Sequence, residues 1–121
     1  IYIKPGTYSE NLTFPASITI FLMGLSAGNQ THEFSGLGAF INPDTIISGN
    51  ITGTGIGSIS NCQITGGTAT LATGFQFVGC YINSYSITNS DSIRINFNDC
   101  RFSSSFIDSI SNKYLLFQMV N

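Results

Sequence analysis

The sequence predicts an all-β protein that folds as a right-handed, single-stranded parallel β-helix, with about five to six coils of roughly 18–20 residues each. Charged residues make up only 8% of the 121 residues, and the polar positions carry Ser, Thr, Asn and Gly instead. Strong helix formers are scarce, and no apolar face with helical spacing is found. One short motif recurs at a spacing typical of a solenoid coil. These three observations together indicate stacked β-coils.

The recurring motif is an apolar residue, two further residues, a cysteine, one more residue and a second apolar residue. It is found at Ile59–Ile64, Phe77–Ile82 and Phe97–Phe102, and its cysteines are 18 and then 20 residues apart. Coils that stack about 4.8 Å apart would align equivalent residues into inward-facing ladders. The expected ladders are Ile59/Phe77/Phe97/Phe117, Cys62/Cys80/Cys100/Val120 and Ile64/Ile82/Phe102.

A sharp bend is expected immediately before each cysteine. Asn61, Gly79 and Asp99 hold this position, and these residue types tolerate a left-handed backbone. The same register places Met119 at a bend, which indicates that the repeat fades there. A third strand per coil is expected at Thr70–Leu71, Ser86–Ile87 and Phe106–Ile107, with polar loops over 88–93 and 108–113.

The part of the chain upstream of these motifs is predicted by extending the 18-residue offset. From Ile59 and Ile64 it leads to Ile41 and Ile46, and therefore to a coil near residues 40–52. The polar, Gly-containing stretch 26–38 is predicted to be a loop that leaves the coil. Residues 1–121 are interpreted as a single β-helix module. Both ends lie in strand-like sequence, so the module is expected to be a fragment of a longer chain.

The first 24 residues carry a resemblance to a known family. Ile3–Leu12, with its Pro-Gly-x-Tyr-x-Glu run, is followed by the apolar strand Ile18–Gly24. This order resembles the opening coil of pectin-lyase-like right-handed parallel β-helix proteins, among them the pectin methylesterases. The resemblance implies that Pro5–Gly6 makes a turn and that Tyr8 and Leu12 point inward. The same opening occurs in enzymes and in non-enzymatic adhesins and viral fibres.

The chemistry of those enzymes is not matched by the later coils. Pectin methylesterases need two aspartates, glutamines and an arginine there, whereas the corresponding outward column of this chain carries no carboxylate. That column is Ser58, Gln76, Asn96 and Leu116. The six acidic residues fall in different columns; they are Glu10, Glu33, Asp44, Asp91, Asp99 and Asp108. We therefore expect no catalytic, cofactor-binding or metal-binding residue in this region.

Four other features are candidate sites. Inward cysteines on successive coils predict buried thiols that pack as small hydrophobic groups. His32 beside Glu33 could serve a catalytic or metal role, but the chain has no second histidine and no Ser or Cys partner whose position can be assigned, which favours a surface loop residue. Gly53–Gly57 has the wrong spacing for a phosphate loop. Tyr81 is expected in an outward column between Gln63 and Arg101, where either a stacked surface ladder or a saccharide-binding strip fits.

Two functions remain open. The first is a non-catalytic structural or attachment module of a larger assembly, such as a virion, fibre, tailspike or surface adhesin. Its expected partners are other regions of its own chain and other subunits, with a surface glycan as a candidate ligand and a virion or extracellular location. The alternative is a fragment of a polysaccharide-binding or polysaccharide-degrading β-helix enzyme whose catalytic residues lie outside this region. The four scattered basic residues argue against nucleic acid, and no apolar run is long enough for a membrane span.

Overall fold

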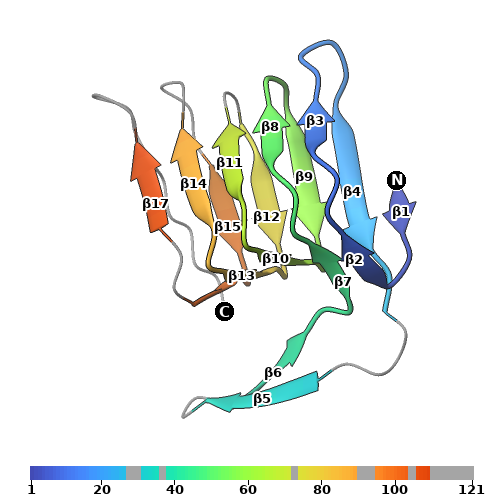
Figure 1. Cartoon of the computed structure of the whole chain (residues 1–121), viewed down its shortest axis with the longest axis vertical. Coiled ribbons are helices and arrows are strands. Elements are labelled where there is room, and N and C mark those ends of the chain that lie inside the picture. Colours follow the sequence, from blue (N-terminus) through green and yellow to red (C-terminus); the bar gives the residue numbers. More distant parts are fainter. Residues whose placement is uncertain (27–30, 36–37, 72–73, 90–94, 104–105, 110–121) are drawn as a thin grey trace.

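The structure is a computed structural model that describes residues 1–26, 31–35, 38–71, 74–89, 95–103 and 106–109. Within these residues every regular element is a β-strand (Figure 1). The strands are β1 (Tyr2–Ile3), β2 (Gly6–Tyr8), β3 (Leu12–Phe14), β4 (Ile20–Gly24), β5 (Thr31–Ser35), β6 (Gly38–Asn42), β7 (Thr45–Ile47), β8 (Ile51–Gly53), β9 (Gly57–Ser60), β10 (Gln63–Thr65), β11 (Thr68–Leu71), β12 (Gln76–Val78), β13 (Tyr81–Asn83), β14 (Ser86–Asn89), β15 (Asn96–Asn98), β16 (Arg101–Ser103) and β17 (Phe106–Ser109). The prediction of an all-β chain is confirmed.

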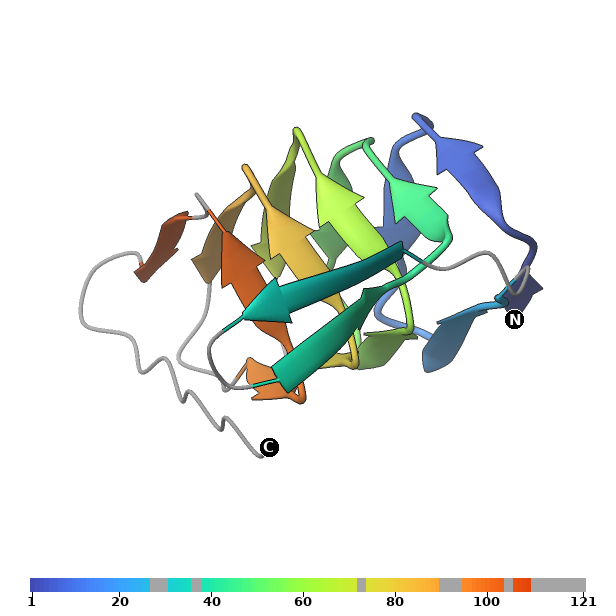
Figure 2. The ribbon, with the colours of Figure 1, turned by 90° about the horizontal axis from the view of Figure 1, so that it is seen from below.

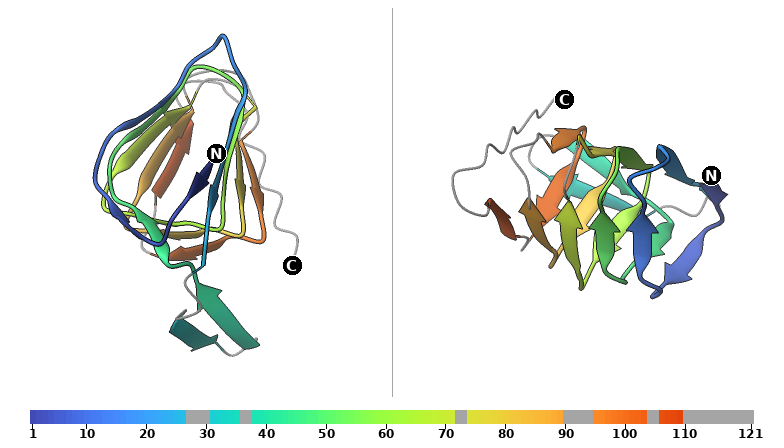
Figure 3. Two further views of the ribbon diagram at one scale, coloured as in Figure 1. Left: turned by 90° about the vertical axis from the view of Figure 1, so that its right-hand side faces the viewer. Right: turned by 90° about the horizontal axis from the view of Figure 1, so that it is seen from above.

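Fifteen of these strands form three five-stranded sheets in which all pairs are parallel. Sheet A has the order β1-β4-β9-β12-β15, sheet B the order β2-β7-β10-β13-β16, and sheet C the order β3-β8-β11-β14-β17. The chain enters sheets A, B and C in turn, and one strand from each sheet makes one layer. The layers, in chain order, are β1-β2-β3, β4-β7-β8, β9-β10-β11, β12-β13-β14 and β15-β16-β17, and the second layer is interrupted by β5 and β6. The left view of Figure 3 looks along the stack, and in it the layers superimpose around a common interior. This arrangement is consistent with a parallel β-solenoid.

The register of the two central ladders follows the prediction. Ile59 pairs with Phe77, and Phe77 pairs with Phe97. Ile82 lies between Ile64 and Phe102 in sheet B. The rings of Phe77 and Phe97 stack with their centroids 5.3 Å apart and their planes 5° apart. The expected continuation of the ladders to Phe117 and Val120 lies outside the described residues, as does Met119.

The bends between sheets A and B also follow the prediction. The backbone φ angle is 52° at Asn61, 60° at Gly79 and 50° at Asp99. A second set of bends, between sheets B and C, was not anticipated. There Gly66 has a φ of 71° and Ser84 a φ of 50°. In the third and fourth layers both corners thus use the left-handed region, which Gly, Asn and Asp enter at the lowest cost.

The register predicted upstream was wrong in two places. Ile59 pairs with Leu22 and not with Ile41. Ile64 pairs with Ile47, whereas Ile46 pairs with Gln63. The cause of the first error is that the chain leaves the sheets after β4 and returns only at β7, which breaks the 18-residue offset. The second error is a slip of one residue, which exchanges the inward and outward faces of a strand.

The segment between β4 and β7 contains an antiparallel hairpin of β5 and β6, in which Thr31 pairs with Asn42 and Ser35 with Gly38. The stretch expected to be a loop therefore holds β5, with His32 in it, and the beginning of β6. Figure 1 shows the hairpin below sheet B, and Figure 2 shows it in front of the solenoid when the molecule is seen from below.

The third strands of the layers are longer than expected. Ser86–Ile87 and Phe106–Ile107 align as predicted, but Ile87 pairs with Ala69, two residues before Leu71. Thr88 and Asp108, the first residues of the expected polar loops, still belong to β14 and β17. The rest of both loops lies outside the described residues.

The core fills the space enclosed by the three sheets. Its fully buried members come from the inward positions of each strand, and the largest are Tyr85, Phe75, Phe77, Phe97, Ile47, Ile51, Ile59, Ile64, Leu71, Ile82, Ile87 and Ile95. Leu12, which the family resemblance places inward, packs against this core. Among the described residues no helix is long and apolar enough to cross a membrane.

Candidate functional site

The acidic side chains that the structure describes lie in different layers of the molecule. Within the described ranges, no three His, Cys, Asp or Glu side chains gather closely enough to hold a metal ion. Glu10 and Asp99 are exposed at turns, and Asp44 is half-buried beside the hairpin. Asp91 lies outside the described residues, and Glu33 and Asp108 are in β5 and β17. The acids whose side chains the structure describes, Glu10, Asp44 and Asp99, lie in the first, second and fifth layers and so do not form a carboxylate pair with one another.

The three cysteines stack on successive layers at the corner between sheets A and B. All are buried and none forms a disulfide. Two thiols donate to backbone carbonyls of the preceding layer: Cys80 Sγ lies 3.4 Å from the oxygen of Ile59 and Cys100 Sγ lies 3.3 Å from that of Phe77. Burial raises the pKa of Cys62 to about 12 and that of Cys80 well above its usual range. A thiol that keeps its proton is a poor nucleophile.

The cysteine column continues into the second layer through a residue of another type. Thr45, fully buried, precedes Ile46 as Cys62 precedes Gln63. Its hydroxyl donates to the carbonyl of Leu25 at 3.0 Å. The residues of this column thus share a small side chain that donates one hydrogen bond to a backbone carbonyl near the corner between sheets A and B. This finding favours a structural role for the thiols.

The outward column Gln63–Tyr81–Arg101 exists as predicted. Tyr81 pairs with Gln63 on one side and with Arg101 on the other. The Arg101 guanidinium carbon lies 5.2 Å from the centre of the Tyr81 ring, within cation–π range. Only 8% of the Tyr81 side chain is exposed. A saccharide stacks on an open aromatic face, and this ring is covered, so the geometry favours the stacked ladder.

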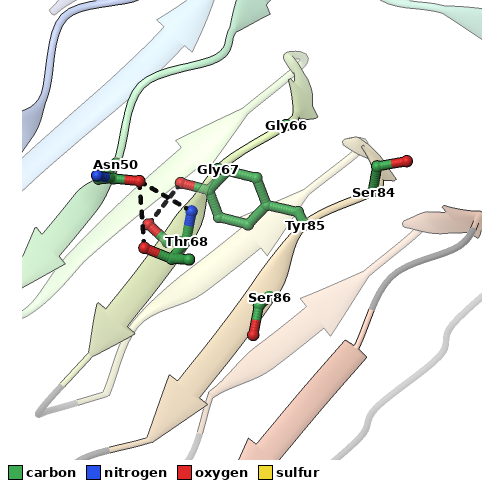
Figure 4. Close-up of a pocket in the computed structure, with 7 residues that line it drawn as sticks. All are labelled: Asn50, Gly66, Gly67, Thr68, Ser84, Tyr85 and Ser86. Carbon is green, nitrogen blue, oxygen red and sulfur yellow. Dashed lines mark hydrogen bonds between the residues drawn. The ribbon is translucent and has the colours of Figure 1, made fainter.

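A shallow depression of about 420 Å³ lies at the corner between sheets B and C, lined by Asn50, Gly66, Gly67, Thr68, Ser84, Tyr85 and Ser86 (Figure 4). Asn50 Oδ1 accepts hydrogen bonds from the backbone amide and from the hydroxyl of Thr68, both at 3.1 Å. One layer earlier, Asn11 Oδ1 accepts from the amide of Asn50 at 3.0 Å. These bonds form a polar ladder along the start of sheet C.

Tyr85 forms the inner wall of this depression. Its hydroxyl lies 3.0 Å from the carbonyl oxygen of Gly49 and 2.9 Å from that of Thr68, and it donates to these oxygens. Burial raises the pKa of this hydroxyl above its usual value. The depression therefore offers neutral amide, hydroxyl and backbone groups, which suit weak polar contacts and lack an acid, a base or an activated nucleophile.

The hydrogen-bond ladder of Asn50 and Thr68 was not predicted from the sequence. A signal was present in the matching triplets Asn11-Leu12-Thr13 and Asn50-Ile51-Thr52, each of which begins a strand of sheet C. The two triplets are 39 residues apart, because the hairpin lies between them, and an offset of 18 or 20 residues does not bring them together. No protein-family model, curated protein or solved structure matches the chain.

Proposed function

We propose that the chain is a non-catalytic structural or attachment module of a larger assembly, such as a virion, fibre, tailspike or surface adhesin. In this proposal it is a right-handed, single-stranded parallel β-helix of the pectin-lyase-like type with about five to six coils. The sheets act as a rigid support, and the corners and the hairpin present contacts to neighbouring parts of the assembly.

The observation that carries this proposal is the concentration of exposed apolar side chains at one end of the solenoid. Seven large apolar residues of the described chain are exposed, and six of them belong to residues 1–25: Ile1, Tyr2, Ile18, Phe21, Met23 and Leu25, with Ile56 as the seventh. Exposed apolar patches on a folded protein commonly mark surfaces that another body covers.

The outer face of sheet A shows where this surface ends. Tyr2 on β1 is opposite Met23 on β4, and both are exposed. One layer further, Phe21 is opposite Ser58, and the same outward column continues with Gln76 and Asn96. The face thus changes from apolar to polar between β4 and β9.

The strand edges at the same end support the proposal. β1, β2 and β3 each stand at the end of a sheet, with one neighbouring strand. Open strand edges invite pairing with further strands. The inward residues Ile3 and Leu12 of this layer are only partly buried. An end with an apolar outer face and partly exposed core residues suits a junction with a neighbouring part of the assembly, either a further region of the same chain or another subunit.

A direct test is self-association of the 121-residue chain. We expect sedimentation velocity to show concentration-dependent association that the triple variant Tyr2→Ser, Phe21→Ser, Met23→Ser abolishes. The matched control, Ser58→Ala with Gln76→Ser and Asn96→Ser, alters the polar part of the same face and should associate like the unmodified chain.

Two results would contradict the proposal. One is that the unmodified chain stays monomeric and that its exposed apolar surface within residues 1–25 binds no apolar dye. The other is turnover of polygalacturonate or another polysaccharide, which would favour the alternative function in polysaccharide degradation.

A further inference from the structure

Tyr81 is buried although it lies on the outside of the solenoid. In β13 its neighbour Ile82 is fully buried in the core, and side chains alternate between the two faces of a strand. Tyr81 therefore points away from the core, yet only 8% of it is exposed. Its column neighbours Gln63 and Arg101 are half-buried on the same outer face. The Arg101 guanidinium lies over one face of the Tyr81 ring. Because Gln63 and Arg101 are themselves half-buried, a further element is expected to cover the outer face of sheet B at the fourth layer.

The hairpin of β5 and β6 is the element in position to do so. Figures 1 and 3 place it below sheet B, on the outer side, and Figure 2 shows it running along the solenoid in front of the strands when the molecule is seen from below. It starts from the second layer, between β4 and β7. It therefore extends from its own layer across later ones.

The hairpin is a self-contained insertion at one corner of the solenoid. At its two ends, Ser26 Oγ donates to Asp44 Oδ2 at 3.3 Å, and Thr45 Oγ1 donates to the carbonyl of Leu25 at 3.0 Å. The chain therefore leaves and returns at the same point. In the later layers this corner is a single bend, as at Asn61 and Gly79.

We propose that the β5–β6 hairpin is a strap, anchored in the second layer, that covers Tyr81 in the fourth layer and couples the unfolding of layers that are not neighbours. In a solenoid each repeat contacts only the repeats beside it, so stability is close to a sum of nearest-neighbour terms. A segment that connects the second layer to the fourth adds an interaction that this scheme lacks. The inference rests on the layered fold and not on the proposed function.

The first experiment removes the strap. Residues 27–42 are replaced by two glycines, which keeps the hydrogen-bonded pair of Ser26 and Asp44. Amide hydrogen exchange is then compared layer by layer. Asn96 and Arg101 donate from the fifth layer to the fourth, whereas Leu12 donates from the first layer to the second.

If the hairpin acts as a strap, its removal should raise the hydrogen-exchange rates of the Asn96 and Arg101 amides by about tenfold or more. This increase should be larger than the increase at the Leu12 amide. A nearest-neighbour stack predicts the opposite order, because the deletion lies in the second layer. Exchange that rises mainly at Leu12, or at no layer, would overturn the proposal.

A second variant keeps the hairpin and removes what it covers. In Tyr81→Ser we expect chymotrypsin to cut after Phe34 or Phe40 about tenfold faster than in the unmodified chain, since the hairpin has lost its contact. The matched control is Val78→Ser, an outward apolar residue of the same layer on sheet A, and its hairpin should be cut at the unmodified rate. Equal rates in the unmodified chain and both variants would overturn the strap even if the deletion variant fails to fold.

Discussion

At the scale of single residues, the corners of the solenoid depend on residues that accept a positive φ. Gly79, Asn61 and Asp99 stand at equivalent bends with φ angles between 50° and 60°. An L-residue pays about 1–2 kcal/mol in this region, with Asn and Asp paying less because of local hydrogen bonds. The Asn61 side-chain amide also donates across the layers, to the carbonyl of Gly24 at 2.7 Å. The bend before each cysteine is thus set by backbone preference together with a corner hydrogen bond.

Gly79 allows the backbone contribution to be measured alone. A Cβ added at Gly79 would meet no atom within 4 Å, so a substitution there changes backbone strain and not packing. We expect Gly79→Val to lower the free energy of unfolding by about 1–2 kcal/mol. Gly79→Asn should cost less than half of that, because the neighbouring layers already use Asn and Asp. Urea denaturation of both variants checks this, and equal losses would show that the bend does not require the left-handed region.

At the scale of elements, the sequence was sufficient wherever a layer follows directly on another. The pairing of β9, β12 and β15 follows from the spacing of Ile59, Phe77 and Phe97, because like residues in register bury one continuous interior. The pairing of β4 with β9 could not be found in this way. The hairpin between β4 and β7 adds residues that contribute nothing to the repeat, so Leu22 and Ile59 lie 37 residues apart. The register of β4 against β9 is therefore set by their pairing in the folded molecule and cannot be derived from a constant spacing in the sequence.

The sequence pattern also did not indicate which side chains of a short strand point inward. In β7 both Ile46 and Ile47 are apolar, so alternation of polar and apolar residues does not indicate which of them points inward. Pairing with Gln63 and Ile64 decides it, and Ile47 becomes fully buried. The polar ladder at the start of sheet C was missed for a related reason, since amide ladders carry no hydrophobic signal.

The ladder at Asn50 is a testable feature of the element. Asn50 is exposed, but its Oδ1 holds the amide and hydroxyl of Thr68 and thereby fixes the start of β11 against β8. We expect Asn50→Ala to lower the free energy of unfolding by about 1–2 kcal/mol, the usual loss for one or two net hydrogen bonds. Thr52→Ala, at an exposed position two residues along the same strand, should change it by less than about 0.5 kcal/mol. Thermal unfolding of the two variants distinguishes the ladder from a general effect of surface polarity.

At the scale of the whole molecule, the low charge of the surface and the neutral hydrogen-bond donors of the interior both follow from the stacking of layers. Stacked layers place equivalent surface residues directly opposite one another, where like charges destabilise a sheet. Hydroxyl and amide side chains avoid this repulsion and form ladders. Inside, the cysteine column, Thr45 and Tyr85 supply uncharged donors to carbonyls at the corners. Burial raises the pKa of Cys62, Cys80 and Tyr85 and so holds these three donors in their protonated form.

This design makes alkaline pH the condition that weakens the molecule. The pKa of Cys62 is raised by burial from 9.0 to about 12, and burial also raises the pKa of Cys80 and Tyr85. In the unfolded chain the Cys62 thiol loses its proton near pH 9, while the folded chain retains it. Between these pH values the unfolded state binds fewer protons, so the free energy of unfolding falls as pH rises. Below pH 9 the contribution of this thiol is constant.

We therefore expect the free energy of unfolding, measured by urea denaturation, to decrease between pH 9 and 12. One fully buried thiol contributes a slope of up to about 1.4 kcal/mol per pH unit. Cys62→Ala should flatten the slope by that amount, whatever its cost in packing, because packing loss does not depend on pH. Gln63→Ala, at the next, half-buried position, should keep the original slope. An unchanged slope in Cys62→Ala would mean that the thiol ionises equally in both states, and that water reaches the cysteine column through the corner between sheets A and B.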